Sequence, residues 1–199
     1  MLACSIGLGS VLSADTDTSK SLSYATYKEV VDRVEVVVGS ELAGVAEHRK
    51  YIPLQIAIGV FGAGPELEIT PRRFLLIDAE RNIMNAVPAG EIAREADLLM
   101  MAKQYTRTNR LKTGQNFALS QRIASNFYPS VGGAFYVVTY LDRGTYLEDL
   151  LFFPCPEAGL EGVLTLRLLT PGMESAVDVR FEVPQVHQKR RKKKQKKEP

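Results

Sequence analysis

The sequence predicts a mainly β fold, an antiparallel immunoglobulin-like β-sandwich of about seven to nine strands that carries one inserted helical segment. Apolar and polar residues alternate over several short segments, which is typical of strands with one buried face. Turns rich in glycine and proline separate these segments at intervals of about 8–12 residues. Strands do not alternate with helices along the chain, so a parallel α/β fold is disfavoured.

The alternation is clearest over residues 177–183, where Val177, Val179, Phe181 and Val183 face one side and charged residues lie between them. Other segments are richer in apolar and β-branched residues, which predicts more central strands. Gly62-Ala63-Gly64-Pro65 is expected to be a hairpin turn. The expected strands are Val34–Val38, Leu54–Val60, Leu67–Ile69, Phe74–Ile77, Phe135–Tyr140, Leu150–Phe153, Val163–Leu169 and Val177–Val183.

Helical spacing of apolar residues begins at Ala89 and continues to about Gln104, with few β-branched residues to interrupt it. A polar link leads to a second expected helix over Phe117–Asn126, which Tyr128-Pro129 would end. We therefore expect a helical insertion at about residues 89–128.

Several strand segments together resemble a known family. Their order is similar to that of the immunoglobulin-like domains of uncharacterised exported bacterial proteins, and the resemblance covers about residues 34–184 apart from the helical insertion. It implies a β-sandwich and export, and it carries no catalytic motif. The segments are Tyr51–Ile58, Leu67–Thr70, Phe74–Arg81, Tyr146–Pro154 and Val179–Pro184.

The 199 residues suffice for one domain with short appendages. Residues 1–14 are uncharged and apolar, which indicates a truncated secretion signal; a short apolar strand or a frayed terminus is the alternative. Cys4, within Leu2-Ala3-Cys4-Ser5, is a candidate for lipidation. Residues 15–33 are expected to be a linker or a short helix, residues 34–184 the sandwich domain, and residues 185–199 a disordered tail.

Charge is distributed unevenly. The chain has 25 Lys and Arg against 23 Asp and Glu, but 8 of the basic residues lie in the tail, which leaves 17 basic against 22 acidic residues before it. The stretch between Leu98 and Leu141 contains no acidic residue. Five basic residues in that stretch form a candidate interaction surface: Lys103, Arg107, Arg110, Lys112 and Arg122.

Two interpretations of that stretch stay open. Basic residues interleaved with Tyr105, Phe117, Phe127 and Tyr128 are typical of surfaces that neutralise phosphates and stack on bases. Alternatively, the aromatic rings attach the helical insertion to the sheet, and the basic residues are simply solvated.

The tail is a candidate polyanion-binding segment. Each basic side chain near an anionic lipid surface contributes about 1 kcal/mol, so several can tether a protein electrostatically. Nucleic-acid binding or nuclear targeting is equally compatible with such a run. Its basic residues are Lys189, Arg190, Arg191, Lys192, Lys193, Lys194, Lys196 and Lys197.

Catalytic and metal-binding patterns are weak. The two cysteines, Cys4 and Cys155, and the two histidines, His48 and His187, are scattered along the chain, so neither a zinc cluster nor a Cys-His pair is indicated. The carboxylate pairs Glu66/Glu68 and Glu148/Asp149 are expected on the solvated face of antiparallel strands. We expect no catalytic residue, cofactor or metal.

These observations predict a non-enzymatic, exported or envelope-associated binding module, periplasmic or lipid-anchored, whose tail acts as an electrostatic tether. The expected partner is an anionic membrane or envelope surface, or another protein, and no small-molecule substrate is evident. The alternative is a cytoplasmic, nucleic-acid-associated protein that uses the tail and the basic insertion together.

Overall fold

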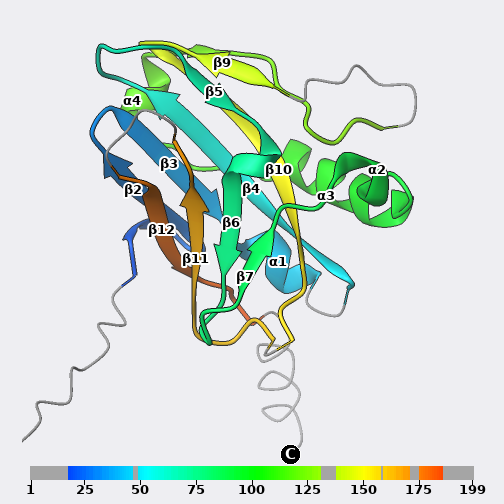
Figure 1. Cartoon of the computed structure of the whole chain (residues 1–199). Coiled ribbons are helices and arrows are strands. Elements are labelled where there is room, and N and C mark those ends of the chain that lie inside the picture. Colours follow the sequence, from blue (N-terminus) through cyan, green and yellow to red (C-terminus); the bar gives the residue numbers. More distant parts are fainter. Residues whose placement is uncertain (1–17, 47–48, 131–137, 158, 171–174, 186–199) are drawn as a thin grey trace, which may run out of the picture.

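The computed structural model describes residues 18–46, 49–130, 138–157, 159–170 and 175–185. Within them the chain is mainly β, with twelve strands arranged in three sheets and a few short helices (Figure 1). The strand pairs are antiparallel except for one parallel pair, so the prediction of a mainly β, largely antiparallel fold is confirmed.

The largest sheet has six strands in the order β1-β2-β3-β4-β10-β8. Its long central pair is β4 with β10, in register from Val60 opposite Thr145 to Tyr51 opposite Pro154. β4 is buried along nearly its whole length, which explains its unbroken apolar sequence. The strands are β1 Lys20–Ser23, β2 Thr26–Val31, β3 Val34–Gly39, β4 Tyr51–Val60, β8 Gln121–Arg122 and β10 Thr145–Pro154.

A second sheet of four strands, in the order β12-β11-β6-β7, lies opposite the first, and a two-stranded sheet pairs β5 with β9. The 3₁₀ helix η1, Pro71–Arg73, leads into β6. These strands are β5 Leu67–Ile69, β6 Phe74–Ile77, β7 Ile83–Asn85, β9 Thr139–Leu141, β11 Val163–Leu168 and β12 Val177–Glu182.

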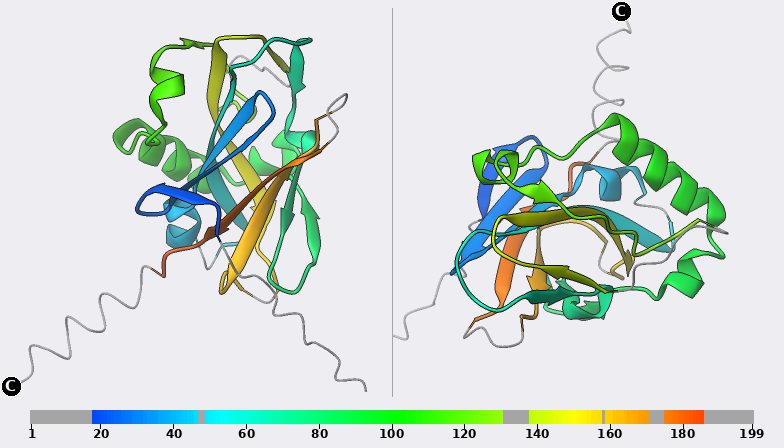
Figure 2. Two further views of the ribbon diagram at one scale, coloured as in Figure 1. Left: turned by 90° about the vertical axis from the view of Figure 1, so that its left-hand side faces the viewer. Right: turned by 90° about the horizontal axis from the view of Figure 1, so that it is seen from above.

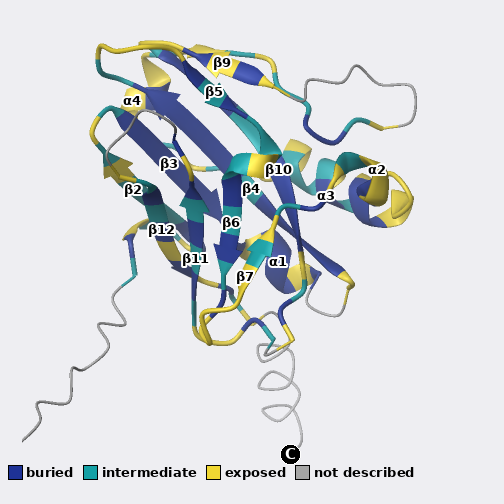
Figure 3. Cartoon of the chain, in the orientation of Figure 1, coloured by how far each residue is buried: buried dark blue, intermediate teal, exposed yellow. Residues whose placement is uncertain are grey.

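The inner faces of the two larger sheets share one hydrophobic core (Figure 3). Hydrogen bonds also connect the sheets at both sides. The Ser19 amide donates to the Arg180 carbonyl at 3.0 Å, and the Val87 amide donates to the Phe152 carbonyl at 2.7 Å. The buried Ser40 hydroxyl donates to the Glu182 carbonyl at 2.6 Å. The core is therefore enclosed by sheets that are joined at both edges.

Helices account for a small part of the chain. α1, Glu41–Val45, follows β3, and the helical insertion contains α2 Ala89–Ile92, α3 Ala96–Thr108 and α4 Gln115–Ala118. The insertion runs along the outside of the six-stranded sheet (Figure 2). It contacts β4 at three positions on one side of the strand. The Tyr51 hydroxyl donates to Glu91 of α2, the Gln55 side-chain amide donates to the Asn109 carbonyl, and Ala57 packs with Phe117 of α4.

The boundaries of the domain are wider than predicted. Residues 20–31 form the hairpin of β1 and β2 instead of a linker or short helix, and they extend the domain toward the N-terminus. Two-residue turns join β1 to β2 and β2 to β3, with Ala25 and Asp32 in the left-handed region at φ 55° and 52°. β1 is an edge strand of the six-stranded sheet and β2 lies next to it. Both are partly exposed, so they lack the apolar runs that identified the other strands.

Two further predictions about elements were wrong. Gly62–Pro65 is not a hairpin turn, because it connects β4 and β5, which belong to different sheets. Helix α4 ends at Ala118, and residues 121–122 form β8 parallel to β10 instead of continuing a helix to Asn126. Beyond β8, the Ile123 amide bonds the Tyr146 carbonyl at 2.7 Å. The exposed edge of β10 therefore determines the conformation here, since its backbone groups need partners.

Several predicted segments lie outside the described residues. They are the N-terminal segment 1–14 with Cys4, the first half of the expected strand Phe135–Tyr140, and the tail beyond Gln185. The second half of that expected strand overlaps β9. The described part of the chain contains no helix that is both long and apolar enough to cross a membrane.

Candidate functional site

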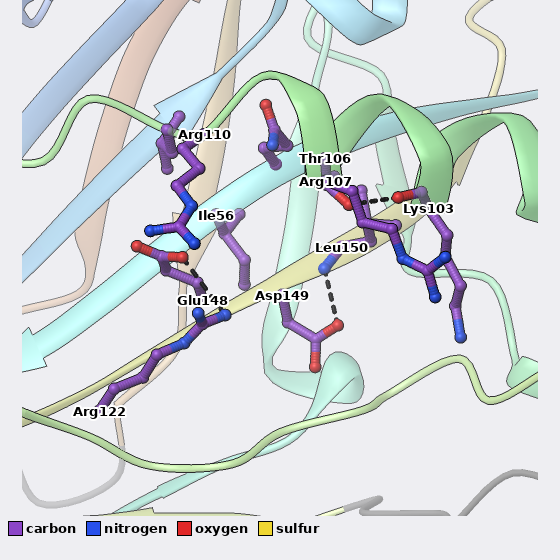
Figure 4. A pocket seen from close by; sticks show the side chains of 11 residues that line it. Ile56, Lys103, Thr106, Arg107, Arg110, Arg122, Glu148, Asp149 and Leu150 are labelled. Carbon is purple, nitrogen blue, oxygen red and sulfur yellow. Dashed lines mark hydrogen bonds and ion pairs between the residues drawn. The ribbon is translucent and has the colours of Figure 1, made fainter.

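A pocket of about 340 Å³, called here the basic pocket, lies between α3 and β10. Lys103 and Arg107 are four residues apart, so they lie on the same face of α3, next to its buried side chains Leu98, Leu99 and Ala102. Figure 4 shows the side chains around the pocket. Its charged lining consists of Lys103, Arg107, Arg110, Arg122, Glu148 and Asp149.

A second hollow adjoins the basic pocket on the other side of the link that follows α3. Gln55, Arg110 and Leu111 line both hollows, and Lys112 lines the second one. The link is fixed to the sheet because the Gln55 side-chain amide donates to the Asn109 carbonyl at 3.0 Å. All five residues of the predicted interaction surface therefore gather around two neighbouring hollows.

Arg122 reaches the pocket from β8 and pairs with Glu148 of β10, with 3.3 Å between Nη2 and Oε2. In Figure 4 the side chains of Arg110 and Arg122 both point toward the Glu148 carboxylate. The Glu148 side chain is 24% exposed, so solvent and ligands can reach it.

Asp149 is the least solvated acidic group of the pocket. Its Oδ1 accepts the amide of Leu150 at 2.8 Å, and its Oδ2 accepts the amide of Phe127 at 3.0 Å. Burial raises the pKa of Asp149, while these amides, the Ser125 hydroxyl and the charge of Lys103 oppose the rise. The carboxylate thus attaches the end of the helical insertion to β10.

Lys103 lies on the opposite side of the pocket from Glu148. Its ammonium donates to Asn126 Oδ1 at 3.3 Å and to Ser130 Oγ at 3.4 Å. Burial lowers the pKa of Lys103, with Asp149 acting against this change and Arg107 adding to it.

The remaining cations are less constrained. Arg107, Arg110 and Lys112 are exposed, and within the described residues none of them forms an ion pair. Arg107 lies in the last turn of α3, where a positive charge also interacts favourably with the helix dipole. These three side chains are available to an anionic ligand.

The aromatic residues of the insertion are buried in the protein. Phe117, Phe127 and Tyr128 are each at most 2% exposed, and Tyr105 is half-buried with its hydroxyl 2.5 Å from Glu41 Oε2. Tyr128 packs edge-on against Phe152 and donates to the Val87 carbonyl at 2.9 Å. Of the two interpretations, the structure supports the second for the rings, which attach the insertion to the sheet.

A buried ion pair also holds the insertion in place. Glu35 of β3 is fully buried on the outer side of the sheet, where it pairs with Lys28 Nζ at 3.0 Å. Its other oxygen accepts the side-chain amide of Asn116 in α4 at 2.8 Å. Nearby, Phe117 packs with Val37 and Ala57 in a small second cluster, so the position of the pocket depends on these contacts.

The other candidates from the sequence do not assemble into a site. Cys155 is half-buried and His48 lies outside the described residues. Glu68 pairs with Arg73 at 2.9 Å. The basic residues of the tail and Cys4 also lie outside the described residues. No group of three or more His, Cys, Asp or Glu side chains in the described ranges is arranged to hold a metal ion.

Sequence reasoning missed one feature of the site. Glu148 and Asp149 were expected on a solvated strand face, yet both line the basic pocket, and Asp149 is poorly solvated. The signal that could have placed them is the acid-free stretch, because a basic insertion must pack against the sheet somewhere and carboxylates are its natural neighbours.

Comparisons with family models, with curated proteins and with solved structures gave no match for this chain.

Proposed function

We propose that this protein is a non-enzymatic binding module that recognises an anionic ligand in the basic pocket. One observation carries the proposal: basic side chains from α3, from the link after it and from β8 converge on two neighbouring hollows. Like charges repel one another, so their convergence without sufficient acidic partners favours an anion between them. Guanidinium groups are well suited to this role because they bind carboxylates and phosphates with two parallel hydrogen bonds.

The arrangement of Asp149 favours binding over catalysis. Both of its oxygens accept main-chain amides, so it is fixed as a structural anchor and is poorly placed to move a proton. A nucleophile with an adjacent base is not found among the residues lining the basic pocket. We therefore keep the proposal of a non-enzymatic protein.

Burial of the aromatic rings disfavours single-stranded nucleic acid as the ligand. Proteins of that class stack bases on exposed rings, but Phe117, Phe127 and Tyr128 are in the interior. A nucleic acid could still contact the exposed arginines through its phosphates, so the test below also measures retention on DNA.

The finer class of the fold and the location of the protein form part of the proposal. Two largely antiparallel sheets around a common core support an immunoglobulin-like sandwich. The apolar residues 1–14 support export to the cell envelope. In this proposal the tail tethers the protein to an anionic membrane or envelope surface, while the basic pocket recognises its ligand separately.

The test uses three variants of the full chain: one lacking residues 185–199, one with Arg107→Ala and Arg110→Ala together, and a control with Arg72→Ala. Arg72 is exposed on η1 and does not line the pocket. Each is assayed for retention on anionic vesicles and on DNA at low and high salt.

We expect the double variant to weaken anion binding about tenfold or more, because charge-assisted hydrogen bonds are lost. Arg72→Ala should leave binding unchanged, and removal of the tail should reduce attachment to vesicles in a salt-dependent manner. Equal binding by the double variant and the control would disprove a role for the pocket. Preference for DNA over vesicles would favour the nucleic-acid alternative.

A further inference from the structure

We infer that the ligand of the basic pocket is a small phosphate ester that carries hydroxyl groups, a conclusion that rests on the proposed anion-binding function. The pocket contains hydrogen-bond acceptors as well as cations, and these two features together define the ligand more narrowly than charge alone.

The charge balance of the pocket indicates a phosphate. Four basic side chains and two carboxylates line it, which leaves an excess of two positive charges when all are ionised. A phosphate monoester carries nearly two negative charges at neutral pH. The cations come from α3, the following link and β8, so they can approach a tetrahedral anion from several directions.

The acceptors indicate hydroxyl groups on the ligand. Glu148 uses Oε2 for Arg122, and within the described part of the chain its Oε1 forms no hydrogen bond. Asp149 accepts two main-chain amides and is also bonded by the Ser125 hydroxyl, so Glu148 is the principal acceptor for a ligand. A bare phosphate would be repelled by these carboxylates, whereas an ester with hydroxyl groups can donate to them.

The size of the pocket restricts the ligand to a small molecule or a small headgroup. A volume of about 340 Å³ is near the lower end for ligand pockets, which range over about 300–1,000 Å³. Glycerol 3-phosphate combines a phosphate with two hydroxyl groups and is a suitable probe. A free metabolite can carry the same groups. The phosphoglycerol headgroup of a lipid has the same two hydroxyl groups on a phosphodiester with one negative charge, and the experiment separates these sources.

The experiment measures the affinity of the full chain by calorimetry for glycerol 3-phosphate, inorganic phosphate and glycerol. We expect glycerol 3-phosphate to bind at least about tenfold more tightly than phosphate, because hydrogen bonds to a carboxylate are charge-assisted, and glycerol not to bind. In Glu148→Gln, binding of phosphate should strengthen because a repulsive charge is lost, while the preference for the ester should decrease. Thermal melting checks that this variant is folded.

Vesicles of phosphatidylcholine with and without phosphatidylglycerol then show whether the ligand is a free metabolite or a lipid headgroup. Displacement of the protein from phosphatidylglycerol by free glycerol 3-phosphate would indicate the headgroup, and binding of the free ester without displacement would indicate a soluble ligand. Equal affinity for phosphate and its ester would overturn this inference but leave the proposed function intact. Absence of any binding that depends on Arg107 and Arg110 would overturn both.

Discussion

The buried ion pair between Lys28 and Glu35 is expected to be important for stability, and the variant Lys28→Met tests this. The Glu35 side chain is 0% exposed and Lys28 is 19% exposed, so removing the ammonium leaves a buried carboxylate with Asn116 as its remaining partner. Removing one partner of a buried pair typically costs 3–5 kcal/mol. Because Lys28 is partly exposed and Asn116 stays in place, we expect a loss of stability at the lower end of this range, about 3 kcal/mol.

An exposed pair provides the control. Arg167 and Asp178 are 39% and 35% exposed, and solvent screens their attraction even though the nearest atoms are 2.6 Å apart. Arg167→Met should therefore cost about 1 kcal/mol or less. The double change Lys28→Met with Glu35→Gln should recover much of the loss, because it removes the uncompensated charge and retains a partner for Asn116.

Urea unfolding followed by far-UV circular dichroism measures these free energies, since the chain has no tryptophan for fluorescence. A Lys28→Met variant no less stable than Arg167→Met would refute the reasoning. So would a double variant less stable than Lys28→Met, because the buried charge would then not be the cause of the loss.

Three further predictions concern the pocket and its support. Burial raises the pKa of Asp149 above the ordinary carboxyl value that it has in the unfolded chain. Between these two pKa values the native state binds more protons than the unfolded state. The contribution of Asp149 to stability therefore falls as the pH rises through this interval. Asp149→Asn should flatten the pH dependence of unfolding in that interval, and an unchanged slope would contradict this. Tyr128→Phe removes the donor to the Val87 carbonyl and should cost about 1–3 kcal/mol in urea unfolding; a neutral effect would mean that the carbonyl finds another partner. Gly59→Ala places a methyl group against the Phe61 and Phe117 rings and should cost about 1–3 kcal/mol by thermal melting, whereas Gly90→Ala meets no atom within 4 Å and serves as the matched control.

Sequence periodicity predicted several of the core-lining strands well. The segments 34–38, 74–77 and 177–183 coincide closely with β3, β6 and β12 because their inner faces are uniformly apolar. The β1-β2 hairpin was missed because both strands are partly exposed and carry mixed polar and apolar residues. Asp32-Arg33 between two runs of valine was the available signal, although the left-handed conformation of Asp32 is uncommon for a residue other than glycine.

The site was predictable in part for a similar reason. The acid-free stretch identified all five basic residues because charge composition is read directly from the sequence. Their partners, Glu148 and Asp149, depend on how α3 lies against β10. These segments are far apart in the sequence, and no local pattern specifies such a contact. The same holds for Glu35, whose contacts with Asn116 are visible only in three dimensions.

The most direct test of the account is the location at which an anion binds. A titration of the isotopically labelled full chain with inorganic phosphate, followed by NMR of the backbone amides and arginine side chains, should shift signals of residues 103–112, Arg122, Glu148 and Asp149 most strongly. The signals of Arg72 and of the four-stranded sheet should stay nearly unchanged. Shifts of equal size over the whole surface, or larger shifts at the four-stranded sheet, would contradict the account.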